Sequence, residues 1–438
     1  MLSRGKQNKY PAHCSPATHS THDLPADTDS VCLHGYLFDF EEGWGTLLDV
    51  HGRVGFETQT KDRQFQIGDI VELHGRVRGG VLLVEQVVPL VKVLKKPWEV
   101  SGDWQRFNGG GGERRQRLMI RDAVHKAIRG FFSNIGFIEV ETPTLVRASG
   151  QEVHLQVFET KPQGGEPLFL TTSPEYHMKR LLGSGFDKIF QICRSYRKGE
   201  SSQTHNPEFT MLEWYRSYSG YEQIIEDVEN LVAHVSRSLL GSTKIEYRGN
   251  SIDLEPPWRR LTLREAFALY AGMDLEVCEN VDEFRQQAHS CGFASVNRDD
   301  SWEDLFFKVL IEKVEPALVG AGPIFLKEYP VRLAALAKIK EDDPGVAERV
   351  EAYIAGLELA NGFTELNDPL EQRQRFMTER QQRRLAGMPV HPLDGDFLDM
   401  LEQGMPPAGG VALGVDRLLM LLTDAASIDE VIAFPFER

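Results

Sequence analysis

The feature that most restricts the fold is a series of short β-type segments near the start of the chain. Five runs rich in aliphatic and aromatic residues are separated mostly by Gly or Asp turns, over residues 31–38, 44–50, 53–59, 70–77 and 81–93. Short strands at this spacing are typical of a small barrel whose last strand closes on the first. The sequence therefore predicts a five-stranded domain over residues 31–96, with the OB-fold as its leading candidate.

The charges of this predicted barrel leave its role open. Residues 31–100 carry eight Lys or Arg residues and ten Asp or Glu residues. Because the net charge of this segment is negative, it has no positive field that would attract a phosphate backbone. Two interpretations therefore remain, a module for packing or partner docking and a residual RNA-binding role.

The first 30 residues differ in composition from the barrel. They are rich in Ser, Thr, His, Pro and Asp and almost lack aliphatic residues, which predicts a disordered tail over residues 1–30. Their His, Cys and acidic residues match no metal-ligand spacing. The five cysteines of the chain form no C-x-x-C pair, which argues against a disulfide framework or a structural zinc site and favours a reducing, cytoplasmic location.

Overall composition excludes several classes of protein. Of the 438 residues, 41% are hydrophobic and 26% are charged, so the chain is not disordered throughout. No apolar run is long enough to span a membrane. The formal net charge of −16 makes the chain a poor general binder of nucleic acids. The chain has no G-x-G-x-x-G sequence after a strand and no P-loop, so neither of the two common nucleotide-binding folds is indicated.

A second, larger domain follows a predicted linker over residues 97–113, which contains four consecutive glycines. Apolar residues then recur every three to four positions, which predicts a helix over residues 114–135. Residues 220–241 and 258–272 have helical patterns too, with strand-like runs between the helices. Helices and hairpins in irregular order favour an α+β domain built on an antiparallel sheet, over residues 114–438.

The segment 190–216 carries the densest set of chemically active side chains. Arg194 and Arg197 stand at the end of a strand-like run, and an arginine fork clamps a phosphate or carboxylate bidentately. If the next run is a strand, one of its faces carries an aromatic ring, a carboxylate and a phenol, from Phe209, Met211, Glu213 and Tyr215. The alternative is a surface hairpin held by salt bridges.

A polar hairpin is predicted around Ala355-Gly356. Strand-like runs flank this dipeptide, which has the length of a two-residue turn. Counting from the turn pairs Glu351 with Ala360 and makes Glu351 and Glu358 diagonal neighbours on one face. Two carboxylates this close favour a cation between them, and Mg²⁺ held by carboxylates and substrate phosphates fits that need. The alternative is a solvated hairpin with two surface acids.

A third segment, residues 409–414, is rich in glycine. Small residues let a ligand approach the backbone closely. Arg417 follows, at a turn before a helix predicted from about Leu418, where it is placed to meet a phosphate. The alternative is that the glycines are packing devices in front of a helix.

Together these segments resemble the signature motifs of class II aminoacyl-tRNA synthetases. The first motif of that family is similar to residues 136–143, GFIEVETP. The resemblance covers residues 114–438 and implies an antiparallel catalytic sheet flanked by helices, with a homodimer formed through the first motif. Within the family the chain resembles the lysine branch in residues 172–176 (TSPEY), 205–211 (HNPEFTM) and 360–366 (ANGFTEL).

Three features resemble the elongation factor P (R)-β-lysine ligases more than the lysyl-tRNA synthetases. They are residues 173–182 (SPEYHMKRLL), residues 193–197 with 211–216 (CRSYR and MLEWYR), and Ala412, where a tRNA-charging enzyme usually carries glycine. The resemblance implies an ATP-dependent enzyme that activates a lysine-like amino acid, (R)-β-lysine, and transfers it to a lysine of elongation factor P. Those ligases normally lack an N-terminal barrel. A lysyl-tRNA synthetase that acts on α-lysine and tRNA therefore remains an alternative, and an inactive binding module is a third.

The resemblance also implies roles for particular residues. ATP would be held by Arg197, Glu200, His205, Asn206, Phe209, Glu351, Glu358 and Arg417, and the two arginines would be catalytic. Mg²⁺ would be bound by Glu351 and Glu358. The amino-acid pocket would comprise Glu175, Glu213, Tyr215, Asn361, Phe363, Glu365 and Ala412, with Glu175 and Glu213 at the two ammonium groups. Gly199 stands where the family has an acid, so Glu200 is expected to substitute for it.

Overall fold

The chain forms two structural units, Met1–Arg115 and Gln116–Arg438. The computed structural model describes residues 15–49, 51–59, 65–96, 99, 101–108, 112–152, 155–162, 165–278 and 280–436. Within these ranges no helix combines the length and the apolar character needed to cross a membrane.

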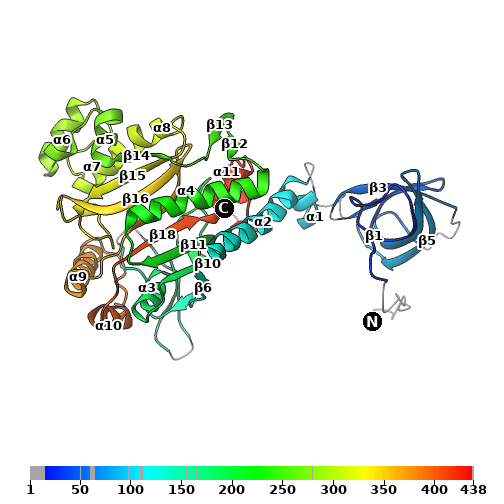
Figure 1. Ribbon diagram of the computed structural model, residues 1–438, viewed down its shortest axis with the longest axis horizontal. Helices are drawn as coiled ribbons and strands as arrows, with labels where there is room; N and C mark the ends of the chain where they lie inside the picture. The colour runs from blue at the N-terminus through cyan, green and yellow to red at the C-terminus, as the bar shows by residue number, and fades with distance from the viewer. Residues whose placement is uncertain are drawn as a thin grey trace, which may run out of the picture. The chain divides into compact units, whose positions relative to one another are not determined.

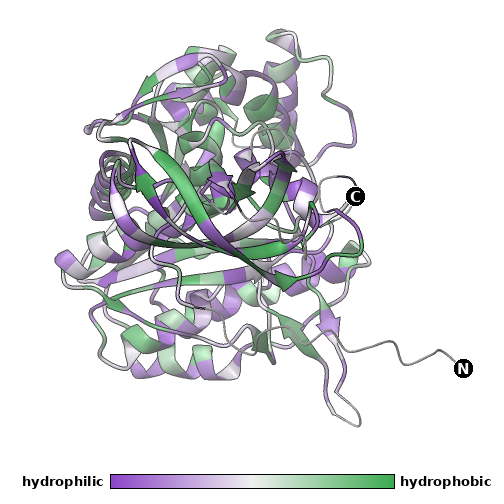
Figure 2. Ribbon diagram, turned by 90° about the vertical axis from the view of Figure 1, so that its right-hand side faces the viewer, coloured by the Kyte–Doolittle hydropathy of each residue, from purple (hydrophilic) through white to green (hydrophobic). Residues whose placement is uncertain are grey.

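The first unit contains a closed five-stranded barrel (Figure 1). Its strands are β1 (Thr28–Glu41), β2 (Trp44–Leu48), β3 (Arg53–Thr58), β4 (Ile70–Arg78) and β5 (Val81–Val91). They are hydrogen-bonded in the order β1-β2-β3-β5-β4, and β4 closes on β1. The strands carry both hydrophobic and hydrophilic residues (Figure 2). Residues two apart, such as Val31 and Leu33 in β1 or Val71 and Leu73 in β4, lie in one buried cluster that fills the interior. The predicted OB-like barrel is confirmed, although Val50, at the end of the second predicted run, lies outside the described residues.

The segment before the barrel is bonded to it. β1 begins at Thr28, three residues earlier than predicted. The Ser15 amide donates a hydrogen bond of 2.8 Å to Glu72 Oε2, and further hydrogen bonds join this segment to the barrel. The prediction of a disordered tail is therefore wrong for residues 15–30, because their polar groups find partners on the strands. Residues 1–14 lie outside the described ranges.

The second unit is built on an eight-stranded sheet. Its strands are β6 (Ile138–Glu139), β10 (Lys188–Tyr196), β11 (Glu208–Ser217), β14 (Arg259–Thr262), β15 (Ile324–Pro330), β16 (Val346–Ile354), β17 (Leu357–Thr364) and β18 (Ala408–Gly414). Their order is β14-β15-β16-β17-β18-β11-β10-β6. The two outermost pairs are parallel and the pairs between them are antiparallel. The predicted α+β class with an antiparallel sheet is confirmed.

Three helices cover one face of this sheet (Figure 1). They are α2 (Glu113–Asn134), α4 (Tyr221–Leu240) and α11 (Val415–Leu422). In α2 the apolar residues Val124, Ile128 and Phe132 recur at four-residue intervals, which puts them on one side of the helix. All three are completely buried and pack with Phe190 and Trp214 of the sheet. The predicted helices over residues 114–135 and 220–241 are confirmed.

Two predicted helix boundaries differ from the structure. Residues 258–272 do not form one helix: β14 comes first and pairs in parallel with β15, followed by α5 (Leu263–Ala266) and a π-helical turn (Phe267–Ala271). The neighbouring strand supplies backbone partners that a local helical pattern does not reveal. α11 begins at Val415 rather than near Leu418, because Gly414 already serves as its N-cap.

The opposite face of the sheet is covered at one end by α3 (Glu175–Gly183), α9 (Pro369–Leu385) and α10 (Gly395–Gln403). These helices pack around Tyr176, Phe376 and Phe397. The same face of β11, β17 and β18 carries polar side chains beyond that end. Short elements complete the chain: α1 (Asp103–Asn108), within the predicted linker, and β7 (Leu145–Val146), β8 (Glu159–Thr160), β9 (Leu168–Leu170), β12 (Lys244–Tyr247) and β13 (Asn250–Asp253).

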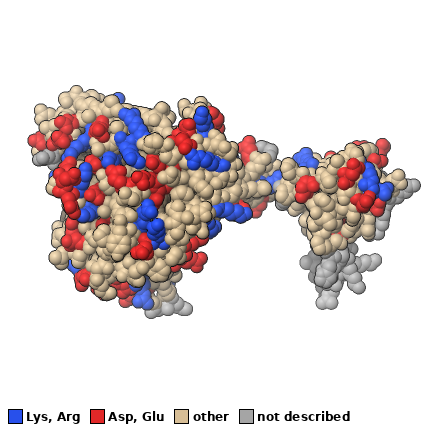
Figure 3. All heavy atoms as spheres, in the orientation of Figure 1, with Lys and Arg blue, Asp and Glu red and all other residues tan. Residues whose placement is uncertain are grey.

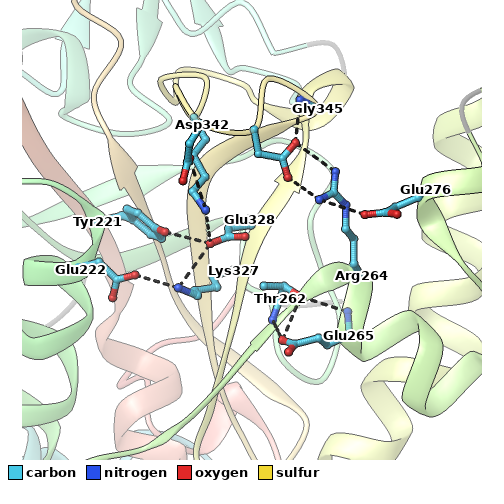
Figure 4. Close-up of polar contacts among 12 residues, drawn as sticks. Tyr221, Glu222, Thr262, Arg264, Glu265, Glu276, Lys327, Glu328, Asp342 and Gly345 are labelled. Atoms are coloured by element: carbon cyan, nitrogen blue, oxygen red, sulfur yellow. Dashed lines mark hydrogen bonds and ion pairs between the residues drawn. The ribbon is translucent and has the colours of Figure 1, made fainter.

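A helical layer with its own hydrophobic core extends the β14 edge of the sheet. It contains α5, α6 (Val281–Ser290), α7 (Trp302–Val309) and α8 (Glu315–Leu318). Polar contacts join the adjacent strand β15 to α4 (Figure 4): Lys327 Nζ donates to Glu222 Oε1 at 2.8 Å, and Tyr221 OH donates to Glu328 Oε1 at 3.2 Å. These contacts fix the strand that lies next to the predicted Glu351 hairpin.

Candidate active site

Two adjoining cavities open on the polar face of the sheet. The larger has a volume of about 530 Å³ and the smaller a volume of about 210 Å³. Arg197, Met211, Asn361 and Ala412 line both cavities, so the two spaces meet at these four side chains. This layout suits two small molecules that react with each other.

The predicted site residues divide between the two cavities. Besides the shared residues, the larger cavity is lined by Glu175, Glu213, Tyr215 and Phe363. The smaller cavity is lined by Glu200, His205, Asn206, Phe209, Glu358 and Arg417. The two remaining predicted residues, Glu351 and Glu365, are buried beside the cavities.

The predicted face of β11 is confirmed by this arrangement. Met211, Glu213 and Tyr215 line the larger cavity, and Phe209 lines the smaller one. The intervening Leu212 points into the hydrophobic core under the helices. Alternation along a single strand therefore separates the site from the core.

A buried lysine that the sequence reasoning missed lies behind Glu175 in the wall of the larger cavity. Lys179 Nζ lies 2.5 Å from Glu175 Oε1 and 2.5 Å from Glu365 Oε2. Burial alone would lower the pKa of Lys179, but the two carboxylates raise it to about 12. Lys179 follows Glu175 by four residues in α3, and that helical spacing was the available signal.

The carboxyl group of Glu213 is held beside this ion cluster. Its oxygens accept hydrogen bonds from Ser173 Oγ and, at 3.0 Å, from Tyr215 OH. Burial, reinforced by the nearby charge of Glu175, raises the pKa of Glu213 to about 8. Burial likewise raises the pKa of Glu365 to about 8, although Lys179 opposes the shift. Glu213 and Glu365 can therefore lose a proton when a cation binds beside them.

The floor of the cavities is a strand of small residues. Ala412 of β18 lies between Glu213 of β11 and Asn361 of β17 in the strand register. A methyl group at Gly410 would lie 2.2 Å from Glu365 Oε1 and 2.3 Å from Tyr215 Cε1. Glycine is therefore required at position 410 for the acidic wall to have its present shape.

His205 holds Arg417 in the smaller cavity. Arg417 Nη2 donates a hydrogen bond of 2.8 Å to His205 Nε2, and Arg417 Nη1 donates one of 2.6 Å to the Glu358 carbonyl. Burial, together with the charges of Arg417 and Arg197, lowers the pKa of His205 to about 4. His205 is therefore neutral at pH 7, with Nε2 as the acceptor and the Nδ1 proton directed to Ser202 Oγ at 2.8 Å.

Arg197 lies where the two cavities meet. Its guanidinium stands 5.2 Å from the centre of the Phe209 ring and 3.9 Å from Glu200 Oε2. Gly199, which lies between Arg197 and Glu200 in the sequence, has a φ of +86°. This conformation turns the chain so that Glu200 lines the smaller cavity. Asn206 Nδ2 donates a hydrogen bond to the Glu208 carbonyl, and Asn206 Oδ1 accepts one from the Phe436 amide. In this structure Asn206 therefore stabilises the wall of the cavity.

The strand pairing predicted for Glu351 is wrong by one residue. The turn pairs Tyr353 with Glu358 as predicted, but the register then shifts and Glu351 lies opposite Asn361 instead of Ala360. An extra residue in one strand of a pair is a β-bulge, and spacing along the sequence does not reveal it.

Three carboxylates nevertheless gather at the hairpin. Glu351 accepts hydrogen bonds from Arg349 Nη2 at 2.7 Å and from Tyr353 OH at 2.8 Å. Burial and the Glu351 charge raise the pKa of Glu358, and burial with the Glu351 and Glu358 charges raises the pKa of Glu315. Carboxylate oxygens are the donors that Mg²⁺ prefers, and a cation would relieve this repulsion. The residues present therefore fit the ion by their chemistry.

Comparison with known proteins identifies the family. Residues 111–438 match the family described as tRNA synthetases class II (D, K and N). The chain belongs to these class II synthetases. As a member of the family, it is an ATP-dependent ligase that forms an aminoacyl-adenylate.

The synthetase is similar over most of its length to proteins named lysine–tRNA ligase. It is 39% identical to the one from Moorella thermoacetica over 391 residues, which cover 86% of this chain and 79% of the relative. It is 37% identical to the one from Pelotomaculum thermopropionicum over 403 residues, 88% of this chain and 79% of the relative. It is 41% identical to the one from Thermosynechococcus vestitus over 392 residues, 85% of this chain and 76% of the relative.

One ion pair links α2 to the segments around Thr210 and Asp416. Arg121 of α2 donates from Nη2 to Asp416 Oδ1, and Asp416 Oδ2 accepts from the Thr210 amide at 2.7 Å. The sequence reasoning missed Arg121 because its partner lies 295 positions away.

Proposed function

We propose that this synthetase activates α-lysine with ATP and transfers the lysyl group to tRNA. The charge of one cluster at the larger cavity, formed by Glu175, Glu213 and Glu365 around Lys179, is the observation that carries the proposal. When ionised, Glu175, Glu213 and Glu365 exceed the single internal ammonium of Lys179 by two charges. Two ammonium groups of a diamino acid balance that excess, and the single ammonium of an ordinary amino acid does not.

The acceptor is inferred from the relatives and the barrel. The relatives described above are named lysine–tRNA ligases, and none of the three is named as an elongation factor P ligase. The chain also has a closed N-terminal barrel, which the elongation factor P ligases normally lack. These observations support tRNA as the acceptor over the β-lysine reading suggested by Ala412. On the face drawn in Figure 3, acidic and basic side chains are interspersed on both units.

The first step follows from charge. The lysine carboxylate is ionised at pH 7, since its ordinary pKa is about 3.5, so it needs no general base. A carboxylate oxygen attacks the α-phosphorus of ATP, the bond from that phosphorus to the bridging oxygen breaks, and pyrophosphate leaves with the bonding electrons. Arg197, which lines both cavities, is placed to hold the carboxylate against the α-phosphate.

The smaller cavity would bind the nucleotide. Arg417, held by His205, supplies positive charge for the leaving phosphates, and Phe209 with Glu200 would contact the adenine. Glu351 and Glu358 would hold Mg²⁺, which when bound neutralises phosphate charge. In the second step a ribose hydroxyl at the tRNA 3′ end attacks the lysyl carbonyl, the bond from that carbon to the phosphate oxygen breaks, AMP leaves with the bonding electrons, and the hydroxyl proton is released to solvent.

The test is lysine-dependent exchange of pyrophosphate into ATP, followed by acceptor assays with tRNA and with elongation factor P. We expect exchange with α-lysine and label in tRNA. Arg417→Ala should lower the exchange rate by about 10²–10³-fold. Arg373→Ala, which removes an exposed ion pair with Glu402, is the matched control and should leave the rate unchanged. Label in elongation factor P alone would contradict tRNA as the acceptor, and absence of exchange would contradict activation.

A homodimer is part of the proposal. Three large apolar side chains at or near the first motif are exposed: Met119 (53%), Ile138 (54%) and Leu145 (46%). A second copy would cover them. Ile138→Asp should shift the mass in solution to that of a monomer, whereas Leu385→Asp, at an exposed position on α9, should not. A monomeric wild-type protein would contradict this part.

A further inference from the structure

Four side chains capable of binding a metal face each other on two neighbouring strands of the barrel. The tetrapeptides Cys32-Leu-His34-Gly in β1 and Glu72-Leu-His74-Gly in β4 differ only in their first residue. The strands are antiparallel, and Cys32 lies opposite His74 while His34 lies opposite Glu72. The two leucines between them point into the barrel core, so the four side chains share the outer face.

The ligand atoms of this group lie close together, and the two contacts of Glu72 are now hydrogen-bond distances that would lengthen when a metal binds. Cys32 Sγ is 3.8 Å from His34 Nε2, and His34 Nε2 is 3.1 Å from Glu72 Oε2. His74 Nε2 is 2.5 Å from Glu72 Oε1, and the ligand atoms of Cys32, Glu72 and His74 all lie within 4.8 Å of one another. Zinc bonds of 2.0–2.3 Å in a tetrahedron place ligand atoms about 3.3–3.8 Å apart.

The cysteine and the carboxylate of the group are covered, whereas the two imidazoles are partly exposed. Cys32 is 5% exposed and Glu72 is 4% exposed, although both stand on the outer face of the barrel. The segment before β1 lies over them: the Ser15 amide donates to Glu72 Oε2, and the Cys32 amide donates to Thr18 Oγ1 at 2.9 Å. A buried carboxylate against a thiol and two imidazoles is an expensive arrangement unless a cation or protons balance it.

We propose that Cys32, His34, Glu72 and His74 form a zinc site that fastens residues 15–18 to the barrel. Thiolate, imidazole and carboxylate together are the donor set of zinc rather than of magnesium or calcium. Binding of Zn²⁺ displaces the Cys32 thiol proton to solvent, and the two imidazoles bind as neutral rings. Scattered cysteines argued against structural zinc in the sequence, but here the ligands pair across strands instead of along one loop.

The test uses the purified full-length protein with Zn²⁺ and Co²⁺ as probes. We expect one tightly held zinc per chain. Replacement by Co²⁺ should give the visible bands of a tetrahedral ion and a near-ultraviolet thiolate-to-cobalt charge-transfer band. The carboxylates Glu351 and Glu358 have no thiolate to offer, so this band separates the barrel site from any metal in the active site.

Variants assign the ligands. Cys32→Ser should abolish or strongly weaken the charge-transfer band, and Glu72→Gln and His74→Ala should each lower zinc affinity by at least about tenfold. Cys291→Ser and His51→Ala are matched controls outside the group and should leave both readouts unchanged. Less than one-tenth of an equivalent of zinc in the wild type, or equal affinity in the ligand variants and the controls, would overturn the proposal.

A second measurement does not depend on how well the variants fold. Removal of the metal from the wild type with a chelator should speed amide hydrogen exchange in residues 15–18, which the site fastens, and leave exchange in the core strand β3 unchanged. Identical exchange with and without zinc would also overturn the proposal.

Discussion

Lys179 Nζ and Glu365 Oε2 lie 2.5 Å apart, and both side chains are completely buried. Glu175 closes the other side of the same ammonium group. The protein thus keeps a lysine ammonium of its own inside the wall that we propose binds lysine. Glu175 was expected to bind one of the two substrate ammonium groups, but it already shares its charge with Lys179, which gives Glu213 the larger part in binding.

Replacement of Lys179 should be severely destabilising. Lys179→Met leaves the buried Glu365 and the partly buried Glu175 without their cation, and breaking a buried pair in this way costs about 3–5 kcal/mol of unfolding free energy. Lys126→Met is the matched control, because Lys126 also follows its partner Asp122 by four residues but on an exposed surface; it should change stability by less than about 0.5 kcal/mol. Chemical denaturation measures both, and equal stability of the two variants would refute the role of the buried cluster.

Lysine affinity should rise with pH up to about 8. The pKa of Glu213 is raised to about 8 in the free enzyme, so below that pH the group is mostly protonated. An ammonium binds the carboxylate, so binding releases a proton, and each pH unit below 8 weakens binding by up to about tenfold. Calorimetric titration between about pH 6 and pH 8 measures the slope.

Glu213→Gln should reduce this slope without removing it, because Glu365 titrates in the same range. Glu303→Gln is the control, since Glu303 lines the same cavity from α7 and has no place in the proposed ammonium site. A slope in the Glu213→Gln variant as steep as in the wild type would contradict the assignment.

The methyl group of Ala412 should influence which lysine isomer is activated. It lines both cavities between Glu213 and Asn361. Ala412→Gly deepens the floor by one methyl group, and such a change alters discrimination by about 1–3 kcal/mol. We expect the ratio of kcat/KM for α-lysine over β-lysine to rise at least about fivefold in pyrophosphate exchange. An unchanged ratio would show that the floor does not select the isomer.

Gly410→Ala should damage the amino-acid cavity. The new methyl group would overlap Glu365 Oε1 and Tyr215 Cε1, so both side chains must move. Displacement of binding groups by about 1 Å lowers kcat/KM by about 10²-fold. Gly395→Ala is the control, because an added methyl group there meets no atom within 4 Å. Wild-type kinetics in the Gly410→Ala variant would contradict the described packing of the wall.

Much of the site was predictable because it follows local patterns. Alternation along β11 placed Phe209, Met211, Glu213 and Tyr215 on one face, and the turn at Ala355 located the hairpin correctly. The predictions that were wrong concern features that depend on distant parts of the chain. A bulge moved Glu351 opposite Asn361, and no local signal marks a bulge in this sequence.

Longer-range pairs were beyond the reach of sequence patterns. Arg121 and Asp416 are 295 positions apart, and only the assembled sheet brings them together. The segment over residues 15–30 has the composition of a tail, yet its hydrogen bonds to the barrel depend on strands that come later in the chain. Composition reports how much apolar surface a segment can bury, but not which polar partners it meets.

Arg197 lines both cavities, so a substrate that moves its guanidinium from one side also changes the surroundings of a substrate on the other side. If binding of one substrate moves the guanidinium of Arg197, the second substrate binds to an altered site, and its affinity changes. Thermodynamic reciprocity then requires that lysine change the Kd of ATP by the same factor as ATP changes the Kd of lysine. Through this one side chain, a ligand in either cavity would change the affinity of the other cavity for its own ligand.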